Sequence, residues 1–125
     1  MKNYHHGNLK KELISCACAM CERDGYTKLS IRSLAKESNV SQTAPYRHFK
    51  TKEDLYAAVS TDGFNKLSKA IHVDVDKKVT KKQIVDMASK YIKFGIKNAN
   101  TYDLMFGTAV ANFSNYPELL ESANS

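Results

Sequence analysis

Apolar residues recur at spacings of three and four along most of the chain, as they do in helices that bury one face. The first such stretch covers residues 8–24, with Asn8 as its expected N-cap and Gly25 as its left-handed stop. Its apolar stripe consists of Leu9, Leu13, Ala17, Met20 and Cys21. Prolines and glycines are few, and β-branched residues form no alternating runs. The pattern therefore predicts an all-α fold.

A second, short helix is expected after residue 30, with Ser30 as its cap. Its inward side chains are expected to be Ile31, Leu34 and Ala35. The turn that follows contains Asn39, a residue type that tolerates the left-handed backbone region. A third helix should therefore start close behind the second.

The third helix is expected to run from Gln42 to His48 with Ser41 as its cap. Pro45 lacks an N–H and disfavours helical geometry at the residue before it, so we expect this helix to be short and tightened. Thr51 is expected to cap a fourth, longer helix that ends near residue 72.

Residues 72–79 break the helical pattern and are expected to form a connection. Thr80 to Gln83 has the form of a capping box, which begins a helix that ends near Lys97. Its apolar face is expected to hold Ile84, Ala88, Tyr91 and Gly95, with Met87 and Phe94 beside it. A turn at 98–100 and an apolar helix at 102–112 should follow.

Pro117 suits the first position of one more helix. The expected organisation has three parts: a DNA-binding domain at 1–50, a connecting helix at 51–72 and a partial helical effector-binding domain at 73–125.

The chain is basic, with a formal net charge of +6 over 125 residues. Residues 1–60 hold 10 Lys+Arg and 6 Asp+Glu, a net charge of +4, and residues 61–125 hold 9 and 7, a net charge of +2. This balance suits a polyanionic partner such as nucleic acid. No apolar run approaches the roughly 18–20 residues of a membrane span, and the first residues lack the apolar core of a secretory signal. We therefore expect a cytoplasmic protein without a membrane partner.

The stretch SIRSLAKESNVSQTAPYRHFKTKEDL, residues 30–55, encodes two short helices joined by a tight polar turn, which is a helix-turn-helix pattern. The second helix of that motif enters the major groove of DNA. Ser41, Gln42 and Thr43 stand at its start, where Gln can pair with adenine and a Thr methyl can touch thymine. The residues that can donate hydrogen bonds to phosphate come next: Tyr46, His48, Lys50, Lys52 and the free N–H groups behind Thr51. Arg47 can reach either a base or the DNA backbone.

These residues also carry a family resemblance. The pattern IRSLAKESNVSQTAPYRHFKTKEDLYAAV, preceded by a helix that ends in Asp24-Gly25-Tyr26, resembles the tetracycline-repressor (TetR) family. The opening YHHGNLKKELI resembles one subgroup of that family, and YIKFGIKNANTYDLMFG, residues 91–107, resembles its effector domain. The resemblance covers nearly the whole chain.

The TetR resemblance implies a homodimer that binds a palindromic operator, usually as a repressor released by a small-molecule effector. By position, Gln42, Thr43 and Tyr46 match DNA-contacting residues of the recognition helix, with Pro45 between them. Arg32 matches a contact made by the preceding helix. The positions that match phosphate contacts are Tyr46, His48 and Lys52. Members of the family are usually longer, and their further helices form the dimer interface and close the ligand pocket, so the chain is expected to be truncated.

An effector pocket is the less favoured interpretation of the aromatic and Met residues in the second half, because such stripes are usually core. Its candidate lining is Tyr91, Phe94, Met105, Phe106 and Phe113.

Other chemistries find little support. Cys16, Cys18 and Cys21 point apart on a helix, so we expect small core residues rather than a metal site. No cofactor and no catalytic residue is expected, since the chain lacks a Ser/His/Asp order and a phosphate-binding glycine loop. The alternative function is a helical protein-interaction co-regulator with a vestigial DNA-binding domain.

Overall fold

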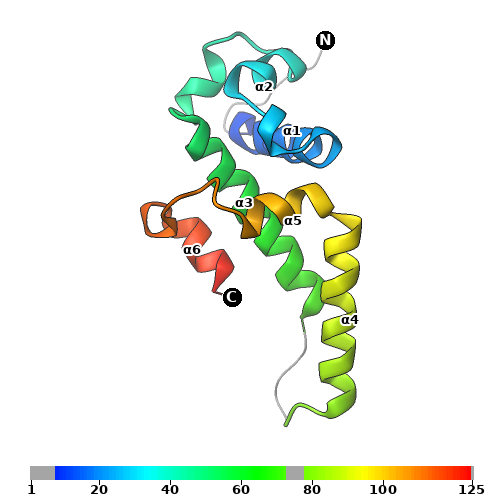
Figure 1. Cartoon of the computed structure of the whole chain (residues 1–125). Coiled ribbons are helices and arrows are strands. Elements are labelled where there is room, and N and C mark those ends of the chain that lie inside the picture. Colours follow the sequence, from blue (N-terminus) through cyan, green and yellow to red (C-terminus); the bar gives the residue numbers. More distant parts are fainter. Residues whose placement is uncertain (1–7, 73–77, 125) are drawn as a thin grey trace.

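A computed structural model describes residues 8–72 and 78–124, and these residues form helices without a strand, as the pattern predicts. The long helix α3 runs through the middle of the molecule, with α1 and α2 at one end and α4 reaching beyond the other (Figure 1). The α-helices are α1 (Leu9–Asp24), α2 (Ile31–Glu37), α3 (Lys52–Ile71), α4 (Lys81–Lys97), α5 (Ala99–Phe106) and α6 (Pro117–Ala123). The 3₁₀ turns are η1 (Tyr26–Lys28), η2 (Ala44–Arg47) and η3 (Phe113–Asn115).

Helix α1 buries the expected stripe except at its first turn. Leu13, Ala17, Met20 and Cys21 are buried, and Leu9 is half-buried. Asn8 stands at the N-cap position, but its side chain makes no capping hydrogen bond. Gly25 has the expected positive φ of 85°, yet its ψ of 155° is extended, so the chain leaves α1 without the left-handed helical turn that the sequence predicted.

Three expected caps are present as reciprocal capping boxes. The side chain of Ser30 accepts from the backbone of Ser33, whose hydroxyl accepts in return from the N–H of Ser30. Thr51 pairs with Asp54 in the same way at the start of α3. Thr80 pairs with Gln83 at the start of α4. Each box satisfies backbone N–H groups that have no partner inside the helix, which fixes where the helix begins.

Helix α3 is the centre of the core, because α1, α4, α5 and α6 all pack against it. Leu55 and Val59 are completely buried along it. Gly63 allows α5 to approach closely: a Cβ on this glycine would lie 2.6 Å from Sδ of Met105. Helix α3 is therefore held by α1 on one side and by the C-terminal helices α4, α5 and α6.

The segment around residue 100 differs from the prediction. Residues 98–100, expected as a turn, contain only one linking residue, Asn98, before α5 begins at Ala99. The side chain of Glu22 in α1 explains the early start: its Oε2 accepts from the backbone N–H of Thr101 at 3.2 Å and from the Thr101 hydroxyl at 2.9 Å. A distant carboxylate thus serves the free N–H groups of α5.

Helix α5 also ends earlier than the expected residue 112, at Phe106. A Cβ at Gly107 would lie 2.6 Å from the carbonyl oxygen of Asp103, so the backbone there passes too close to its own helix for any larger residue. The following residues turn toward α3, where the N–H of Ala111 donates to Glu53 at 3.1 Å and Val110 is buried.

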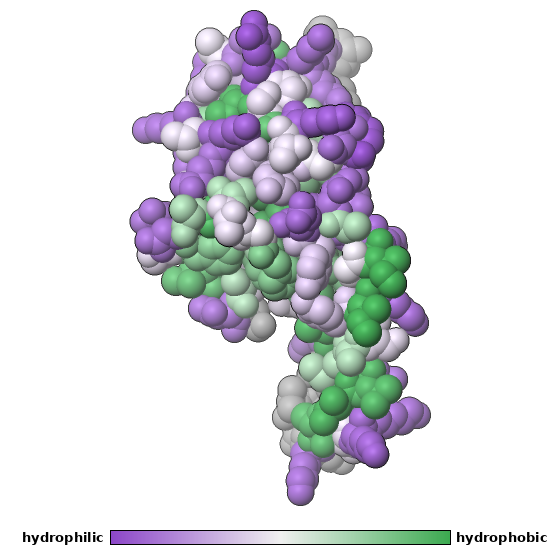
Figure 2. Space-filling model, in the orientation of Figure 1, coloured by the Kyte–Doolittle hydropathy of each residue, from purple (hydrophilic) through white to green (hydrophobic). Residues whose placement is uncertain are grey.

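Helix α4 has the expected length, but its apolar face is only partly covered. Phe94 is buried, whereas Ile84, expected on the apolar face, is 57% exposed and Ala88 is exposed as well. The α4 apolar face comprises Ile84, Val85, Ala88, Ile92 and Ile96, with Ile96 reaching 75% exposure. Figure 2 shows apolar surface running along this helix. On the face expected from the sequence, Ile84 and Ala88 are thus exposed, while Tyr91 and Gly95 are half-buried.

None of the described helices combines the length and the apolar character that a membrane crossing requires.

Candidate nucleic-acid interface

The reader tip, residues 41–49, follows the turn at Asn39, whose φ is 58° as expected. The expected helix over 42–48 is shorter in the structure: only Ala44–Arg47 is helical, and it is a 3₁₀ turn. Ser41 does not cap it, because its hydroxyl lies 3.4 Å from the Thr43 hydroxyl and accepts no backbone N–H of the turn. The missing N–H of Pro45 accounts for the tightening, as the sequence predicted.

Two buried side chains anchor this tip. Pro45 and Phe49 are almost completely buried, and the N–H of Phe49 donates to the carbonyl of Pro45 at 2.9 Å. The buried ring of Pro45 has no surface to offer to DNA, so its expected place among the DNA-facing residues is corrected to a structural one. Its anchoring leaves the neighbouring side chains directed away from the core.

The polar residues of the tip lie on the surface. Ser41, Gln42, Thr43 and Arg47 are exposed, and Tyr46 is 49% exposed. His48 is half-buried, with its ring centroid 6.3 Å from that of Phe49. The tip thus combines amide, hydroxyl, phenol and guanidinium groups on one short exposed segment.

Helix α2 adds basic residues beside the tip. Arg32 and Lys36, one turn apart, line a hollow of about 530 Å³ together with Ser30, Ser33 and Gln42. The hollow therefore brings the expected Arg32 and Gln42 together across the turn. Lys36 was missed in the sequence, although its i+4 spacing from Arg32 was a sufficient signal.

The segment after the tip carries Lys50 and Lys52, both exposed. The Nζ of Lys52 lies 5.6 Å from the centroid of the Tyr56 ring, a cation–π distance. The backbone N–H groups of Lys50 and Thr51 donate to the carboxylate of Asp54, and the N–H of Asp54 donates to the Thr51 hydroxyl. The N–H of Asp54, one of those expected to be free behind Thr51, is thus already occupied.

Tyr116, from the C-terminal part, completes this carboxylate network. Its hydroxyl lies 3.0 Å from Oδ1 of Asp54 and 3.0 Å from Oε1 of Glu53. Burial and the two carboxylates raise the pKa of Tyr116. Burial by itself raises the pKa of Asp54, but the hydrogen bonds from Tyr116, Thr51 and Lys50 outweigh it and lower that pKa below its ordinary value. The start of α3 is therefore tied to residues far along the chain.

The candidate effector residues separate into two groups. Phe106 and Phe113 contact Phe64 of α3, with 5.2 Å between the ring centroids of Phe64 and Phe106, and Tyr91 contacts Phe106. Phe94 and Met105 are buried in the core. Phe64 and Tyr102, which touch the first group, were missed in the sequence: Phe64 lies on another helix, whereas the i+4 spacing from Tyr102 to Phe106 was a local signal.

Cys21 is buried in the core, and Cys16 and Cys18 are half-buried beside it. The thiol of Cys18 donates to Asp62 at 3.3 Å, that of Cys16 faces Met20, and that of Cys21 faces a carbonyl of α5. Burial raises the pKa of Cys21 to about 11. In residues 8–72 and 78–124, no three His, Cys, Asp or Glu residues are placed to share a metal ion.

Residues 13–59 match a family model described as "Bacterial regulatory proteins, tetR family". Among solved structures, the chain is similar to a protein of unknown function from Rhodococcus sp. RHA1, with a TM-score of 0.79 and 29% sequence identity. The match covers 99% of this chain and 64% of that one, so the chain spans less than two thirds of this relative's length. No curated protein matches the sequence.

Proposed function

Because the chain belongs to the tetR family of bacterial regulatory proteins, we propose that it is a sequence-specific transcriptional regulator that binds a palindromic DNA operator as a homodimer. It acts in the cytoplasm, as a regulator and not as an enzyme, and it uses no cofactor. Residues 1–50 serve as the reader, 51–72 as the connecting helix and 73–125 as part of an effector-binding domain.

One observation carries this proposal: the reader tip exposes its polar side chains while Pro45 and Phe49 hold it from inside. Gln42 and Thr43 read base edges in the major groove, because an amide pairs with adenine and a methyl group touches thymine. Ser41 and Arg47 stand beside them, within reach of bases or backbone. A tip with apolar side chains outside would not support this role.

Residues around the tip position the protein on the DNA backbone. Arg32 on α2 and the tip residue Tyr46 are exposed, and the exposed Lys50 and Lys52 follow the tip along the chain. Contacts of this kind supply affinity and register without reading sequence. His48 donates to phosphate from its half-buried position.

The α4 apolar face offers a second copy a packing surface in addition to the further helices that form the dimer interface in longer members of the family. Apolar residues of α4 cover roughly 200° of the helix circumference, about twice the arc that one packing contact needs. Phe94 faces α3, and the opposite residues Ile92 and Ile96 face outward. An exposed apolar surface of this kind usually marks a protein interface.

Release by a small molecule needs a path from the C-terminal part to the reader. Glu22 with Thr101 joins α1 to α5, and Tyr116 with Asp54 joins the C-terminal segment to α3. A ligand near the aromatic cluster of Tyr91, Phe106 and Phe113 would act on α3 through Phe64 and so change the tilt of the reader. On this basis we propose repression that ends when the effector binds.

Titration of labelled duplex DNA with the full chain at several salt concentrations tests the proposal. We expect log affinity to fall linearly with log salt, with a slope of about 0.9 per phosphate contact. Lys52→Ala should weaken binding to every sequence and reduce the slope by about 0.9, whereas Lys69→Ala, at the far end of α3, should change neither. Salt-independent binding, or equal effects of the two variants, would contradict it.

The co-regulator alternative is favoured by the same exposed face of α4, which suits a protein partner as well as a second copy. It predicts no duplex affinity even at low salt, together with a stable complex with another protein. The measurement at the lowest salt concentration therefore separates the two functions, because only the DNA-binding regulator binds the duplex there.

A further inference from the structure

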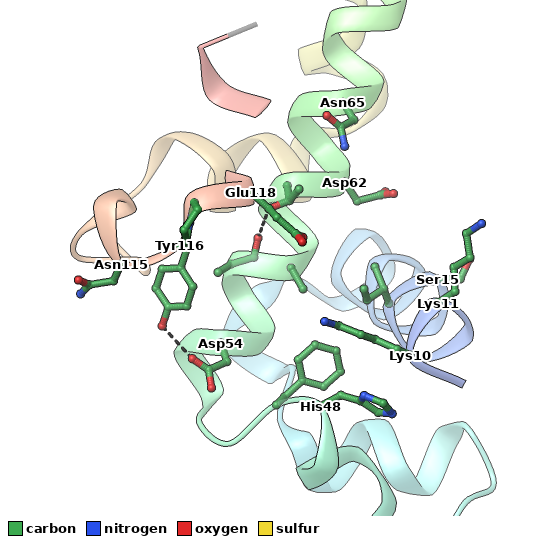
Figure 3. A pocket seen from close by; sticks show the side chains of 16 residues that line it. Lys10, Lys11, Ser15, His48, Asp54, Asp62, Asn65, Asn115, Tyr116 and Glu118 are labelled. Atoms are coloured by element: carbon green, nitrogen blue, oxygen red, sulfur yellow. Dashed lines mark hydrogen bonds between the residues drawn. The ribbon is translucent and has the colours of Figure 1, made fainter. Parts of the chain in front are cut away.

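A groove of about 690 Å³ lies between α1, α3 and the start of α6, apart from the aromatic cluster (Figure 3). Its volume is in the range of small-molecule sites in proteins. The floor is apolar and contains Ile14, Phe49, Ala57, Ala58 and Pro117. The groove is therefore suited to the apolar body of a ligand.

The rim of this groove carries opposite charges on opposite sides. Lys10 and Lys11 belong to α1, and Glu118 belongs to the first turn of α6. In Figure 3, Lys10 extends from α1 into the groove, while Glu118 extends into it from the other side. A ligand between them would meet a cation at one end and an anion at the other.

These charges have no protein partner in the described part of the chain. The ion pairs there involve Arg23 and Lys66, and none includes Lys10, Lys11 or Glu118. Asp62, which also lines the groove, is already paired with Lys66 at 3.0 Å. Lys10 and Glu118 thus form no ion pair with each other, yet both border the same hollow.

We propose that this groove binds an amino-acid-like zwitterion with an apolar body, with its carboxylate at Lys10 and its ammonium group at Glu118. The apolar body lies on Phe49 and Pro117. The complementary charges select a dipolar molecule over one with a single charge, because a single charge leaves one rim group without a partner.

The position of the groove makes its ligand an effector of the reader, a consequence that rests on the proposed function. Its walls include His48 and Phe49 at the inner end of the reader tip and Tyr116 beside Asp54 at the start of α3. A molecule bound there touches the reader and the C-terminal segment together. If it changes DNA affinity, DNA must change its affinity by the same factor.

Dansyl-lysine labelled on Nε, which keeps its α-ammonium and α-carboxylate groups free, is a suitable fluorescent probe for the groove. Titrated against the full chain without DNA, it should bind saturably with a rise in fluorescence. Dansylglycine, which carries only the negative charge, and dansylcadaverine, which carries only the positive charge, should each bind about tenfold more weakly or worse. Equal binding of all three probes would overturn the proposal, since it would show an unselective apolar surface.

Variants that each remove one charge from the groove test where the probe binds. Lys10→Met and Glu118→Gln should each weaken dansyl-lysine binding about tenfold. Lys69→Met and Glu12→Gln, which remove the same charges from exposed sites outside the groove lining, should leave it unchanged. Circular dichroism confirms that each variant is folded. Unchanged probe affinity in both groove variants would overturn the site.

A duplex titration without probe separates this proposal from the proposed function. We expect Lys10→Met to bind duplex DNA as the unchanged protein does. If Lys10→Met instead loses DNA affinity and keeps its probe affinity, Lys10 is a phosphate contact and the groove proposal fails while the DNA-binding function stands. If probe binding behaves as expected but the chain binds no duplex, the site stands and the proposed function fails.

Discussion

Pro45 sets the shape of the segment that carries Gln42, Thr43 and Tyr46. Its buried ring and missing N–H replace an α-helix with a 3₁₀ turn, and the exposed residues on either side follow from that anchoring. The sequence predicted the tightening from proline chemistry alone. It did not predict that the ring is buried, because that depends on packing against residues elsewhere in the chain.

Gln42 is expected to read one base pair. In a binding-site selection, Gln42→Ala should lose the preference at that position at a cost of about 1–3 kcal/mol and keep the preferences elsewhere. Gln83→Ala removes the same amide from the capping box of α4 and should keep every preference. A Gln42→Ala selection identical to that of the unchanged protein would remove this residue from direct readout.

The cysteine thiols are expected to react unequally. Burial raises the pKa of Cys21 from 9.0 to about 11, so its thiolate fraction at pH 8 is about a hundredfold below that of an ordinary cysteine. Burial and the Asp62 carboxylate raise the pKa of Cys18 further. Titration with an aromatic disulfide reagent should label Cys16 first, and all three should react in denaturant. Three equal fast rates in the folded protein would contradict this placement.

At the scale of elements, local sequence patterns predicted where helices begin better than where they end. Ser30, Thr51 and Thr80 were identified as caps because the residues that bond them lie only three positions away. The start of α5 was not predicted, since the group that serves it is Glu22, on another helix. The end of α5 depends on a backbone contact at Gly107, which no spacing reveals.

Thr51 should stabilise the reader through its capping box. Thr51→Ala should lower the free energy of unfolding by about 1 kcal/mol, whereas Thr51→Ser, which keeps the capping hydroxyl, should lower it much less. Thr43 is the matched control, because its side chain makes no capping bond to η2, so Thr43→Ala should cost little. Denaturant unfolding measures the three values, and equal losses at Thr51 and Thr43 would contradict the cap.

The hydroxyl of Tyr116 should stabilise the junction between α3 and the C-terminal segment. Tyr116→Phe removes the single O–H donor that two carboxylates share, and the free energy of unfolding should fall by about 1–2 kcal/mol near neutral pH. Phe106→Leu, which removes no hydrogen bond, serves as a control for the pH dependence described next.

The pH dependence of that difference has a definite sign. The lowered pKa of Asp54 gives stability that is present above its ordinary value of 3.8 and lost as the pH falls below it. The raised pKa of Tyr116 gives stability that is present below its ordinary value of 10.0 and lost as the pH rises above it. The difference between the unchanged protein and Tyr116→Phe should therefore be level from about pH 5 to 9 and shrink on both sides. A constant difference down to pH 3 would contradict the Asp54 contact.

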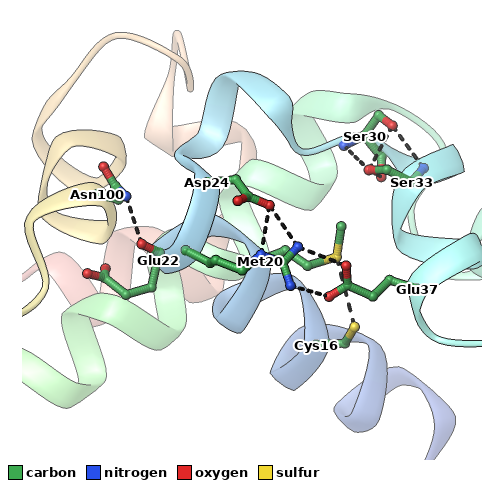
Figure 4. A network of polar contacts seen from close by, with 9 residues as sticks. Cys16, Met20, Glu22, Asp24, Ser30, Ser33, Glu37 and Asn100 are labelled. Carbon is green, nitrogen blue, oxygen red and sulfur yellow. Dashed lines mark hydrogen bonds and ion pairs between the residues drawn. The ribbon is translucent and has the colours of Figure 1, made fainter.

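At the scale of the whole molecule, polar contacts fasten the reader to the C-terminal helices. Figure 4 shows Asn100 meeting the carbonyl of Glu22 at one end of α1, near the exposed pair of Arg23 and Glu37 that joins α1 to α2. The Arg23 pair is solvent-exposed and contributes little, whereas the Asn100 contact joins segments 78 residues apart. Sequence spacing predicted the helices on both sides but not this docking.

The apolar face that the sequence predicted on α4 is only partly covered in the described residues. Periodicity identifies an apolar face without naming its partner, and no described residue covers Ile84 or Ile92. The candidate effector cluster was incomplete for the same reason. Phe64 belongs to it but lies on α3, and periodicity within one helix does not show which other helix packs against it.

Self-association should depend on the α4 apolar face. Sedimentation at increasing concentration should show a dimer, and Ile92→Glu with Ile96→Glu should weaken it at least about tenfold. Both side chains are more than half exposed, so the stability of the monomer should barely change. Helix α4 holds five lysines and one aspartate, a net charge of +4, so added salt should strengthen the dimer while weakening DNA binding. An unaffected dimer would place the interface elsewhere.

The central claim is that the reader tip meets DNA, and NMR chemical-shift mapping with a short duplex at low salt tests it most directly. The account predicts that the largest amide shifts fall on residues 41–50 and on Arg32, with α4 unmoved. Shifts confined to α4, or an undisturbed tip at saturating duplex, would contradict it.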